Sequence, residues 1–324
     1  MSRIVVTRRI PQPALDLLAV SGNELWVSEV DGALPAEDLH RAITGADAVV
    51  TLLHDRVDDA FLDAAGPALR VVANVAVGYD NVDVAACARR GVAVTNTPGV
   101  LTEATADLAF ALVLMATRRL GEGERLVRSG GQWSWSMFFL LGSGLQGRVL
   151  GVVGLGQIGR ATARRAHAFG MTIAYAAPRR VEAAVEAELS ATYLPLDELL
   201  ATADVVSLHC PLRPETHHLI DAAALASMKP TAFLVNTTRG PVVDEAALVD
   251  ALRAGSIAGA GLDVYEREPV VHPGLLELEN VVLLPHLGSA TVETRTAMAV
   301  LAARNVLAVL GGVEPLTPVH PRRT

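Results

Sequence analysis

Short runs rich in valine and isoleucine alternate with stretches rich in alanine and leucine along most of this 324-residue chain. The apolar runs are IVVT (4–7), DAVVTL (47–52), RVVANV (70–75), VAVT (92–95), VLGVVG (149–154), TIAYA (172–176), DVVSL (204–208), AFLVN (232–236), IAGAGL (257–262) and VVLL (281–284). Continuously apolar strands separated by helices are typical of parallel sheets that are covered on both faces. The pattern therefore predicts an α/β protein built from β–α–β units.

The number of expected strands favours two sheets. Ten strands would make a large single open sheet, and a chain of this length is typical of two domains. A Pro/Gly turn at 95–99 ends the first series of strands, and an Ala-rich helix expected from Ala290 can return to it. We expect residues 1–99 plus 288–324 to form one doubly wound domain, and residues 100–287 to form a second domain inserted into the first.

Composition argues against several classes of protein. Hydrophobic residues make up 51% of the chain and charged residues 19%, which provides for a large core. The net charge of −8 disfavours nucleic-acid binding, because phosphate contacts need a basic surface. The apolar stretch 108–117 is too short to span a membrane, and Arg8 and Arg9 interrupt a signal-peptide pattern. Two cysteines, Cys87 and Cys210, are too few for a disulfide framework or a zinc site, so we expect a cytoplasmic protein without a metal.

The segment GVVGLGQIGR contains glycines at dinucleotide-binding spacing, namely Gly154, Gly156 and Gly159. An apolar strand (149–153) precedes them and a helical stretch (157–170) follows. The alternative interpretation of the glycines is a plain turn between a strand and a helix. In a dinucleotide-binding unit the first glycine allows a tight turn, the second lets a pyrophosphate approach, and the third lets helix and strand pack closely. The N–H groups at the start of the helix attract the phosphates.

The next strand ends without the acid that is typical of NAD sites. About twenty residues after the glycine loop, an Asp or Glu would hold the ribose 2′-hydroxyl of NAD. The chain instead carries Ala176, Ala177, Pro178, Arg179 and Arg180. Small residues remove the repulsion of a 2′-phosphate, and two guanidinium groups can pair with it. This pattern predicts NADP(H), with NAD(H) as the alternative if the arginines are ordinary surface charges.

Three charged or titratable residues follow successive expected strands: Arg239, Glu268 and His286. Each alone has an ordinary structural explanation, as a turn arginine, a solvated loop carboxylate or a histidine at a helix start. Ligands of open α/β sheets bind at the carboxyl ends of the strands, where all three fall. Arginine binds a carboxylate through two parallel hydrogen bonds, histidine donates a proton near neutral pH, and a carboxylate orients the imidazole. These groups suit the reduction of a 2-keto acid.

Seven motifs resemble, in order, those of the D-isomer-specific 2-hydroxyacid dehydrogenase family. They are NVAVGYDNVD (74–83), NTPGVLTEATADLA (96–109), GLGQIG (154–159), HCPLRPET (209–216), NTTRG (236–240), GLDVYEREP (261–269) and PHLGSAT (285–291). The resemblance covers nearly the whole chain. Within the family the chain is most similar to glyoxylate/hydroxypyruvate reductases, on the segments TEATADLAFALVLMATRRL (102–120) and GGQWSW (130–135). The resemblance implies two Rossmann- or flavodoxin-like domains with a cleft between them.

The resemblance also implies catalytic roles. Arg239 would bind the substrate carboxylate and polarise the keto group, His286 would donate the proton, and Glu268 would pair with His286. The N–H groups of Val77 and Gly78 would also hold the carboxylate.

Further positions are expected to bind the cofactor or shape the substrate pocket. The expected cofactor-binding residues are Thr105, Gly154, Leu155, Gly156, Gln157, Ile158, Gly159, Arg179, Arg180, Cys210, Pro211, Thr216, Thr237, Asp263 and Gly288. For Asp263 the ordinary interpretation is a helix cap or a loop acid. We expect Leu53 to shape the substrate pocket. The resemblance also implies a homodimer in which a tryptophan of the partner subunit caps the substrate site, and Trp135 is the candidate.

Other functions within this resemblance remain open. Formate dehydrogenases have glutamine where Glu268 stands, so the carboxylate disfavours that activity. Phosphoglycerate dehydrogenases often carry a C-terminal regulatory domain, whereas this chain ends soon after the expected return helix. The alternative from another class is a non-catalytic, NAD(H)-sensing scaffold similar to corepressors of this fold. The intact set of Arg239, Glu268 and His286 in this chain argues against a scaffold and for an enzyme.

Overall fold

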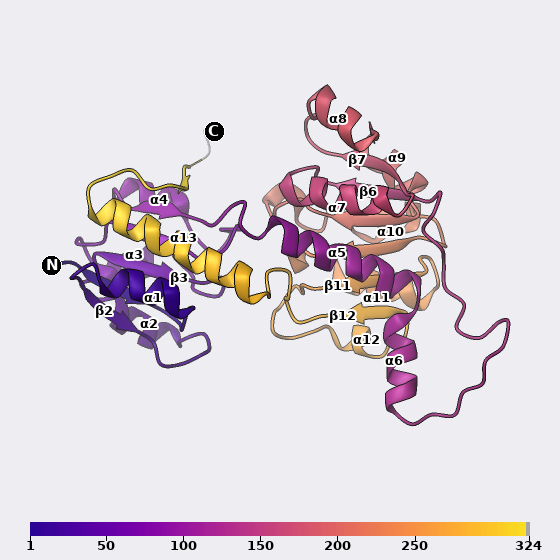
Figure 1. The fold of residues 1–324 in the computed structure, drawn as a ribbon, viewed down its shortest axis with the longest axis horizontal. Coiled ribbons are helices and arrows are strands. Elements are labelled where there is room, and N and C mark those ends of the chain that lie inside the picture. Colours follow the sequence, from indigo (N-terminus) through magenta and orange to yellow (C-terminus); the bar gives the residue numbers. More distant parts are fainter. Residues whose placement is uncertain (322–324) are drawn as a thin grey trace. The chain divides into compact units, whose positions relative to one another are not determined.

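The computed structural model describes residues 1–321. The chain divides into two compact units (Figure 1), one formed by Met1–Leu101 with Ala290–Thr324 and the other by Thr102–Ser289. The second unit is therefore inserted into the sequence of the first.

The first unit contains a six-stranded sheet in the order β13-β5-β4-β3-β1-β2. Its strands are β1 (Arg3–Val6), β2 (Glu24–Val27), β3 (Ala48–Thr51), β4 (Val71–Asn74), β5 (Ala93–Thr95) and β13 (Pro318–Val319). All neighbours pair in parallel except β13, which pairs antiparallel with β5 at the edge.

Helices cover both faces of this sheet. On one face α1 (Gln12–Ala19) and α13 (Val292–Leu310) lie side by side (Figure 1) and bury Ile4 and Val6 of β1. On the other face the neighbouring Val5 packs with residues of α2 (Ala36–Ile43), α3 (Asp59–Ala65) and α4 (Val84–Arg89). Alternate residues of one strand thus enter two cores, which explains why the strands are apolar throughout.

The second unit contains a seven-stranded sheet in the order β12-β11-β10-β9-β6-β7-β8, with every neighbouring pair parallel. The strands are β6 (Val149–Val153), β7 (Thr172–Ala176), β8 (Ala191–Tyr193), β9 (Val205–Leu208), β10 (Phe233–Asn236), β11 (Gly259–Leu262) and β12 (Val281–Leu283). The chain moves outward from β6 in one direction through β7 and β8, then in the other through β9. This reversal is the switch point at which doubly wound sheets bind ligands.

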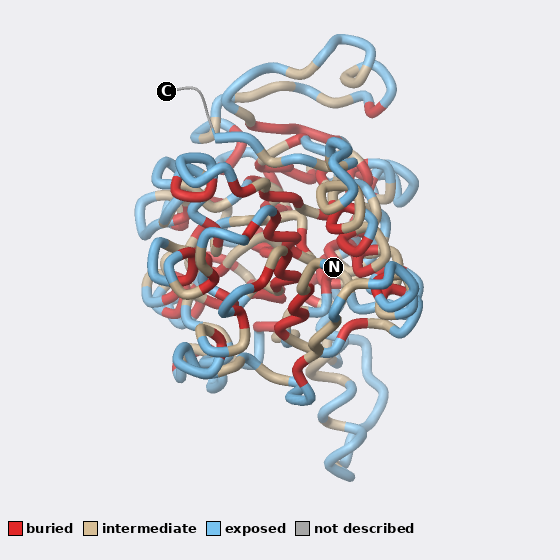
Figure 2. Tube along the Cα trace, turned by 90° about the vertical axis from the view of Figure 1, so that its left-hand side faces the viewer, coloured by how far each residue is buried: buried red, intermediate tan, exposed pale blue. Residues whose placement is uncertain are grey.

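Helices again form two layers around the sheet, with the buried residues between them. Figure 2 shows buried residues mainly in the interior of the trace and exposed residues mainly at its periphery. One layer contains α5 (Thr102–Thr117), α7 (Gln157–Ala168) and α8 (Ala183–Leu189). The other contains α9 (Leu196–Thr202), α10 (Ala222–Ser227), α11 (Glu245–Arg253) and α12 (Pro273–Leu276). Two 3₁₀ turns, Pro214–Thr216 and Gly240–Val242, precede α10 and α11. No helix within residues 1–321 is long and apolar enough to cross a membrane.

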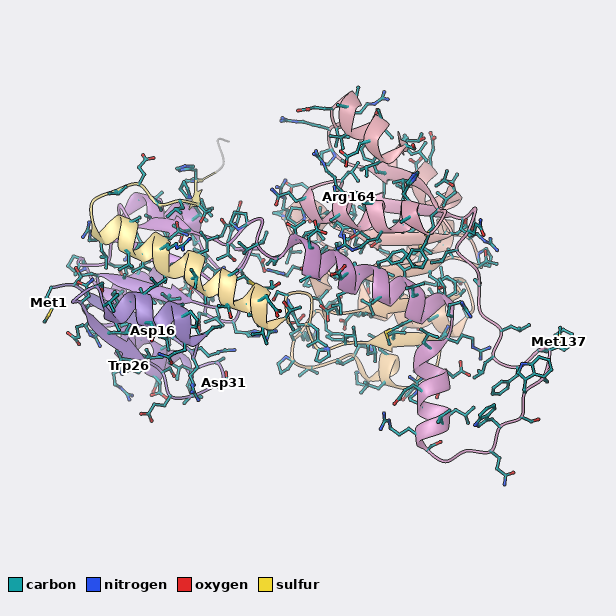
Figure 3. The ribbon with its side chains drawn as sticks, viewed as in Figure 1. Met1, Asp16, Trp26, Asp31, Met137 and Arg164 are labelled. Carbon is teal, nitrogen blue, oxygen red and sulfur yellow. The ribbon has the colours of Figure 1, made fainter. Side chains whose placement is uncertain are left out.

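A long excursion without regular structure follows α6 (Leu120–Arg128), a helix with no buried residue. Figure 3 shows Met137 far out on this segment of the second unit. Six of its large apolar side chains are exposed, namely Trp133, Trp135, Met137, Phe138, Phe139 and Leu141. Such a series of apolar side chains in water is a mark of an interaction surface.

The predicted fold class, two doubly wound parallel-sheet α/β domains, is confirmed. All ten expected strands are present, and the helix expected from Thr102 begins there. The sequence missed β2, β8 and β13, because none of their residues is buried, whereas each of the other strands has at most one residue that is not buried. Their residues therefore lack the continuous apolar pattern that identified the rest.

The buried Asn305 of α13 generates a prediction about stability. Its carboxamide donates to Thr317 Oγ1 at 2.8 Å and accepts from the Thr317 N–H at 3.1 Å, and the Thr317 hydroxyl donates to the Asn96 carbonyl. We expect Asn305→Ala to lower the free energy of unfolding by about 1–3 kcal/mol, because buried polar groups lose their partners. Thermal unfolding should show this loss, and the exposed neighbour in Arg304→Ala is the control. Equal stability of the two variants would contradict the role of this network.

Candidate active site

The polar residues predicted from the sequence of the second unit gather at the carboxyl ends of its parallel strands. Arg239 follows β10, Asp263 follows β11, and His286 follows β12. The glycine loop follows β6 at the same edge. This edge, at the switch point of the sheet, is where the second unit can bring a cofactor and reacting groups together.

His286 and Glu268 form a direct pair. His286 Nδ1 lies 2.7 Å from Glu268 Oε2, and Glu268 Oε1 accepts the N–H of Tyr265 at 3.1 Å. Burial alone would raise the pKa of Glu268, but the hydrogen bond and charge of His286, the Tyr265 N–H and the charge of Arg239 outweigh burial and hold this pKa below its usual value. Glu268 is therefore a charged partner for the imidazole at neutral pH.

The loop that carries His286 is fixed by Asp263. Its buried carboxylate accepts the N–H groups of Leu287 at 2.7 Å and Gly288 at 2.8 Å, while its carbonyl accepts the N–H of His286 at 2.9 Å. Burial raises the pKa of Asp263 despite these two N–H donors. The loop needs this support, because His286 has a φ of 55°, a conformation that non-glycine residues seldom adopt.

Three of the expected cofactor-binding residues lie together here. A Cβ at Gly288 would stand 3.4 Å from Asp263 Oδ2 and 3.4 Å from Thr105 Cγ2. Thr105 comes from the first turn of α5, so residues distant in sequence meet at one point. The carboxylate of Asp263 already serves the 286–288 loop, a supporting role that its position in the sequence did not reveal.

Arg239 lies in a turn that packs tightly against the segment after β11. Asn236 Nδ2 donates to the Arg239 carbonyl at 2.9 Å, and Arg239 Nη1 donates to the Thr238 carbonyl at 2.8 Å. A Cβ at Gly240 would stand 1.8 Å from the Tyr265 carbonyl carbon, so only glycine permits this approach. The turn therefore brings Arg239 close enough to Glu268 for its charge to lower the pKa of that carboxyl.

The glycine loop fits a dinucleotide. Gly154 has a φ of +98° and its backbone approaches Cys210 so closely that a Cβ would lie 2.8 Å from the Cys210 nitrogen. A Cβ at Gly159 would lie 2.3 Å from the Gly154 oxygen, so this glycine permits the packing of α7 on the loop. A Cβ at Gly156, in contrast, would meet no described atom within 4 Å. Gly156 is the N-cap of α7 and offers no side chain to the first N–H groups of the helix, which leaves room and donors for a pyrophosphate.

The remaining expected cofactor positions differ in their contacts. Leu155, Gln157 and Ile158 belong to the same loop and helix start. Cys210 and Pro211 follow β9 beside Gly154. The Thr216 hydroxyl donates to the Pro211 carbonyl at 2.7 Å and accepts the Arg213 N–H at 2.8 Å, so it supports this turn.

The Thr237 hydroxyl is buried and has no hydrogen-bond partner within the described part of the chain. Thr237 is therefore a member of the expected set whose buried polar group is unused.

In the first unit, Val77 and Gly78 lie in the loop after β4, and Leu53 follows β3. Side-chain amides hold this loop, since Asn96 donates to the Val77 carbonyl at 2.9 Å and Asn74 donates to the Gly78 carbonyl at 3.1 Å. Among residues 1–321 the N–H groups of Val77 and Gly78 have no hydrogen-bond partner. Two free donors on adjacent residues suit a carboxylate. Sequence reasoning missed the two asparagines; their signal was that Asn74 ends β4 and Asn96 directly follows β5.

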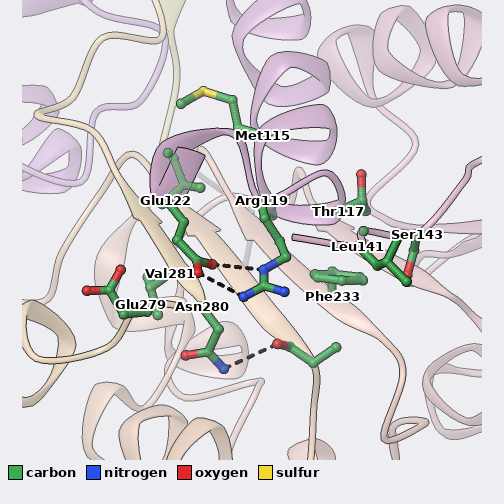
Figure 4. A pocket seen from close by; sticks show the side chains of 15 residues that line it. Met115, Thr117, Arg119, Glu122, Leu141, Ser143, Phe233, Glu279, Asn280 and Val281 are labelled. Atoms are coloured by element: carbon green, nitrogen blue, oxygen red, sulfur yellow. Dashed lines mark hydrogen bonds and ion pairs between the residues drawn. The ribbon is translucent and has the colours of Figure 1, made fainter. Parts of the chain in front are cut away.

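A pocket of about 320 Å³ in the second unit lies elsewhere (Figure 4). Its lining includes Phe233, Ala258 and Asn280, which stand at the amino ends of β10, β11 and β12. Arg119 and Glu122 form an ion pair at its wall. The pocket is thus at the edge of the sheet opposite to His286 and carries none of the predicted site residues.

Residues 110–288 match the family model described as D-isomer specific 2-hydroxyacid dehydrogenase, NAD binding domain. The chain is 48% identical to a glyoxylate reductase of Thermococcus onnurineus over 98% of this chain and 96% of that protein. A solved structure from Thermus thermophilus has a TM-score of 0.92 at 47% identity and covers 98% of this chain and 99% of its own. Another solved structure is that of an NADPH-dependent glyoxylate/hydroxypyruvate reductase of Sinorhizobium meliloti in complex with NADP and malonate. It has a TM-score of 0.84 at 39% identity and covers 100% of this chain and 99% of its own.

The contrasting surroundings of Gly156 and Gly159 generate a prediction. Gly156→Ala should leave the unfolding temperature nearly unchanged but weaken the binding of a nicotinamide dinucleotide, because its methyl group enters the open space over the helix start. Gly159→Ala should lower the unfolding temperature, because its methyl group meets backbone. Thermal unfolding and fluorescence titration with NADPH measure both effects. Normal dinucleotide binding by Gly156→Ala would contradict this placement of the pyrophosphate.

Proposed function

Because the chain belongs to the D-isomer specific 2-hydroxyacid dehydrogenase family, we propose that it reduces small 2-keto acids, glyoxylate and hydroxypyruvate, with NADPH. The observation that carries the proposal is the His286–Glu268 pair, which lies at the sheet edge that also bears Arg239 and the glycine loop. The names of the Thermococcus and Sinorhizobium relatives support this choice of substrates.

His286 supplies the proton in this reaction. Its Nδ1 faces Glu268 Oε2 at 2.7 Å, so Nδ1 carries a hydrogen toward the carboxylate and Nε2 is the nitrogen left for the substrate. A reduced nicotinamide, when bound, supplies the hydride to C2 of the keto acid. The Nε2–H of His286 protonates the keto oxygen as negative charge develops there, and the negative charge of Glu268 stabilises the imidazolium before the transfer.

Arg239 and the loop after β4 bind the substrate carboxylate. The guanidinium of Arg239 offers a planar fork that matches a carboxylate and also polarises the neighbouring keto group. The N–H groups of Val77 and Gly78, which have no partner among residues 1–321, are further candidate donors for a carboxylate. With the carboxylate held at fixed points, C2 is oriented for hydride transfer.

The preference for NADPH rests on the residues after β7. Ala177 stands where an acid would repel a 2′-phosphate, and Arg179 and Arg180 follow it. The Sinorhizobium relative, which is NADPH-dependent, supports this choice of cofactor.

A substrate assay with matched histidine variants tests the proposed reaction. With glyoxylate and NADPH, His286→Gln should lose roughly 10²–10⁴-fold in kcat, the contribution of a proton donor. As the pH is raised, the activity of Glu268→Gln should fall at a lower pH than that of the wild type. The neutral amide no longer stabilises the protonated ring of His286, so the ring loses its proton more easily. The exposed His167 of α7 in His167→Gln serves as the control.

Absence of NADPH oxidation with any small 2-keto acid would refute the proposed function. Unchanged kcat in His286→Gln would refute the assignment of the proton donor.

We further propose a homodimer whose contact includes the exposed segment 130–141. Its six apolar side chains are exposed in the described part of the chain, and contact with a second copy would remove them from water. Trp135, which is 75% exposed, would then reach the substrate site of the second copy.

Light scattering tests the assembly. The wild type should have the mass of a dimer, whereas Trp135→Ala combined with Phe138→Ala should dissociate at micromolar concentration and raise the KM for glyoxylate. The apolar Val20, which is also highly exposed, in Val20→Ser controls for loss of surface hydrophobicity. A wild-type monomer with normal activity would disprove the dimer.

A further inference from the structure

The two arginines after β7 have different surroundings. Arg180 forms a two-pronged ion pair with Glu186 of α8, with Nε 2.8 Å from Oε1 and Nη2 2.8 Å from Oε2. Arg179 is exposed and forms no hydrogen bond or ion pair within residues 1–321. The side chains are adjacent in sequence, but only Arg179 is unengaged.

Tyr175 holds Glu186, the acidic partner of this ion pair, by a hydrogen bond. This fully buried residue of β7 donates its hydroxyl hydrogen to Glu186 Oε1 at 2.6 Å and accepts the N–H of Val181 at 3.0 Å. One hydroxyl therefore joins the strand, the loop over 177–182 and α8. The Glu186 side chain is only 12% exposed, so this carboxylate is fixed against the loop.

Glu186 is ionised near neutral pH. The hydrogen bonds from Arg180 and Tyr175 lower the pKa of Glu186 to about 2. Using Arg180 for another anion would break two charge-assisted hydrogen bonds and leave this carboxylate with the tyrosine hydroxyl alone. Arg180 is therefore engaged in the ion pair with Glu186, whereas Arg179 has no such partner within residues 1–321.

We propose that the two arginines divide the selection of the cofactor: Arg179 binds the 2′-phosphate of NADPH, whereas Arg180 neutralises Glu186 so that this carboxylate does not repel the phosphate. The proposal rests on the proposed preference for NADPH and assigns it to particular side chains. Arg180, Glu186 and Tyr175 are positioning residues, and Arg179 is the contact.

The physical reason is charge balance at the end of β7. An NAD site uses an acid at this place to bind two ribose hydroxyls, and the same acid repels a phosphate. This chain has Ala177 in place of such an acid but carries a carboxylate at Glu186 on the following helix. Without Arg180, that carboxylate would restore the unfavourable charge.

Four variants separate the two roles: Arg179→Ala, Arg180→Ala, Glu186→Gln and the double variant Arg180→Ala/Glu186→Gln. The dissociation constants of NADPH and NADH are measured by fluorescence, and those of 2′,5′-ADP and 5′-AMP by calorimetry. Arg179→Ala should weaken NADPH and 2′,5′-ADP by about 10–100-fold, the loss of a charge-assisted contact, and change NADH by less than about twofold. The exposed Arg41 in Arg41→Ala controls for loss of positive charge alone.

Arg180→Ala should also weaken NADPH and 2′,5′-ADP, and the added Glu186→Gln should restore both to near the wild-type values. This rescue is the result that a direct phosphate contact by Arg180 would not give. Glu186→Gln alone should bind NADPH as tightly as the wild type. Thermal unfolding of each variant reports any general damage, which would weaken NADH and 5′-AMP equally.

Two results would overturn the proposal. Normal binding of 2′,5′-ADP by Arg179→Ala would remove Arg179 as the contact. Failure of Glu186→Gln to rescue Arg180→Ala would show that Arg180 itself meets the phosphate. Equal binding of NADPH and NADH by the wild type would instead refute the proposed cofactor preference, and the two adenosine probes would still decide between the arginines.

Discussion

Burial of the parallel strands on both faces is the constraint on which the rest of the structure depends. β10 and β11 are buried at every position, so charged side chains have no place within them. Reactive groups must lie in the loops beyond the strands. Because all strands of the second unit are parallel, these loops meet at one edge, where Arg239, Asp263 and His286 lie.

Buried polar side chains then give these loops fixed shapes. Asp263 holds the loop of His286, Asn236 holds the turn of Arg239, and Asn74 and Asn96 hold the loop of Val77 and Gly78. Hydrogen bonds of this kind are strong where water is excluded, and they position groups without joining the reaction. The Tyr175–Glu186–Arg180 network after β7 also positions its groups, although its Arg180 side chain is exposed to water.

The sequence was most informative where function follows from local pattern. Apolar runs identified strands, and the rule that ligands bind at carboxyl ends selected Arg239, Glu268 and His286, two of which form a direct pair. The pattern could not separate Arg179 from Arg180, because the pairing of Arg180 depends on a helix that brings Glu186 back to the loop. Similarly, the support that Asp263 gives to the 286–288 loop depends on the path of a segment after another strand. Contacts between loops are three-dimensional and have no local signature.

The proposed reaction is direct hydride transfer to C2 of a 2-keto acid at this edge of the sheet, with the stereochemistry of the D-isomer specific family. The most direct test is the reaction of hydroxypyruvate with NADPH that carries deuterium at the transferred position of nicotinamide C4, followed by NMR and chiral analysis of the product. The account predicts one deuterium at C2 of glycerate, in the D configuration. A product without deuterium at C2, or with the L configuration, would contradict it.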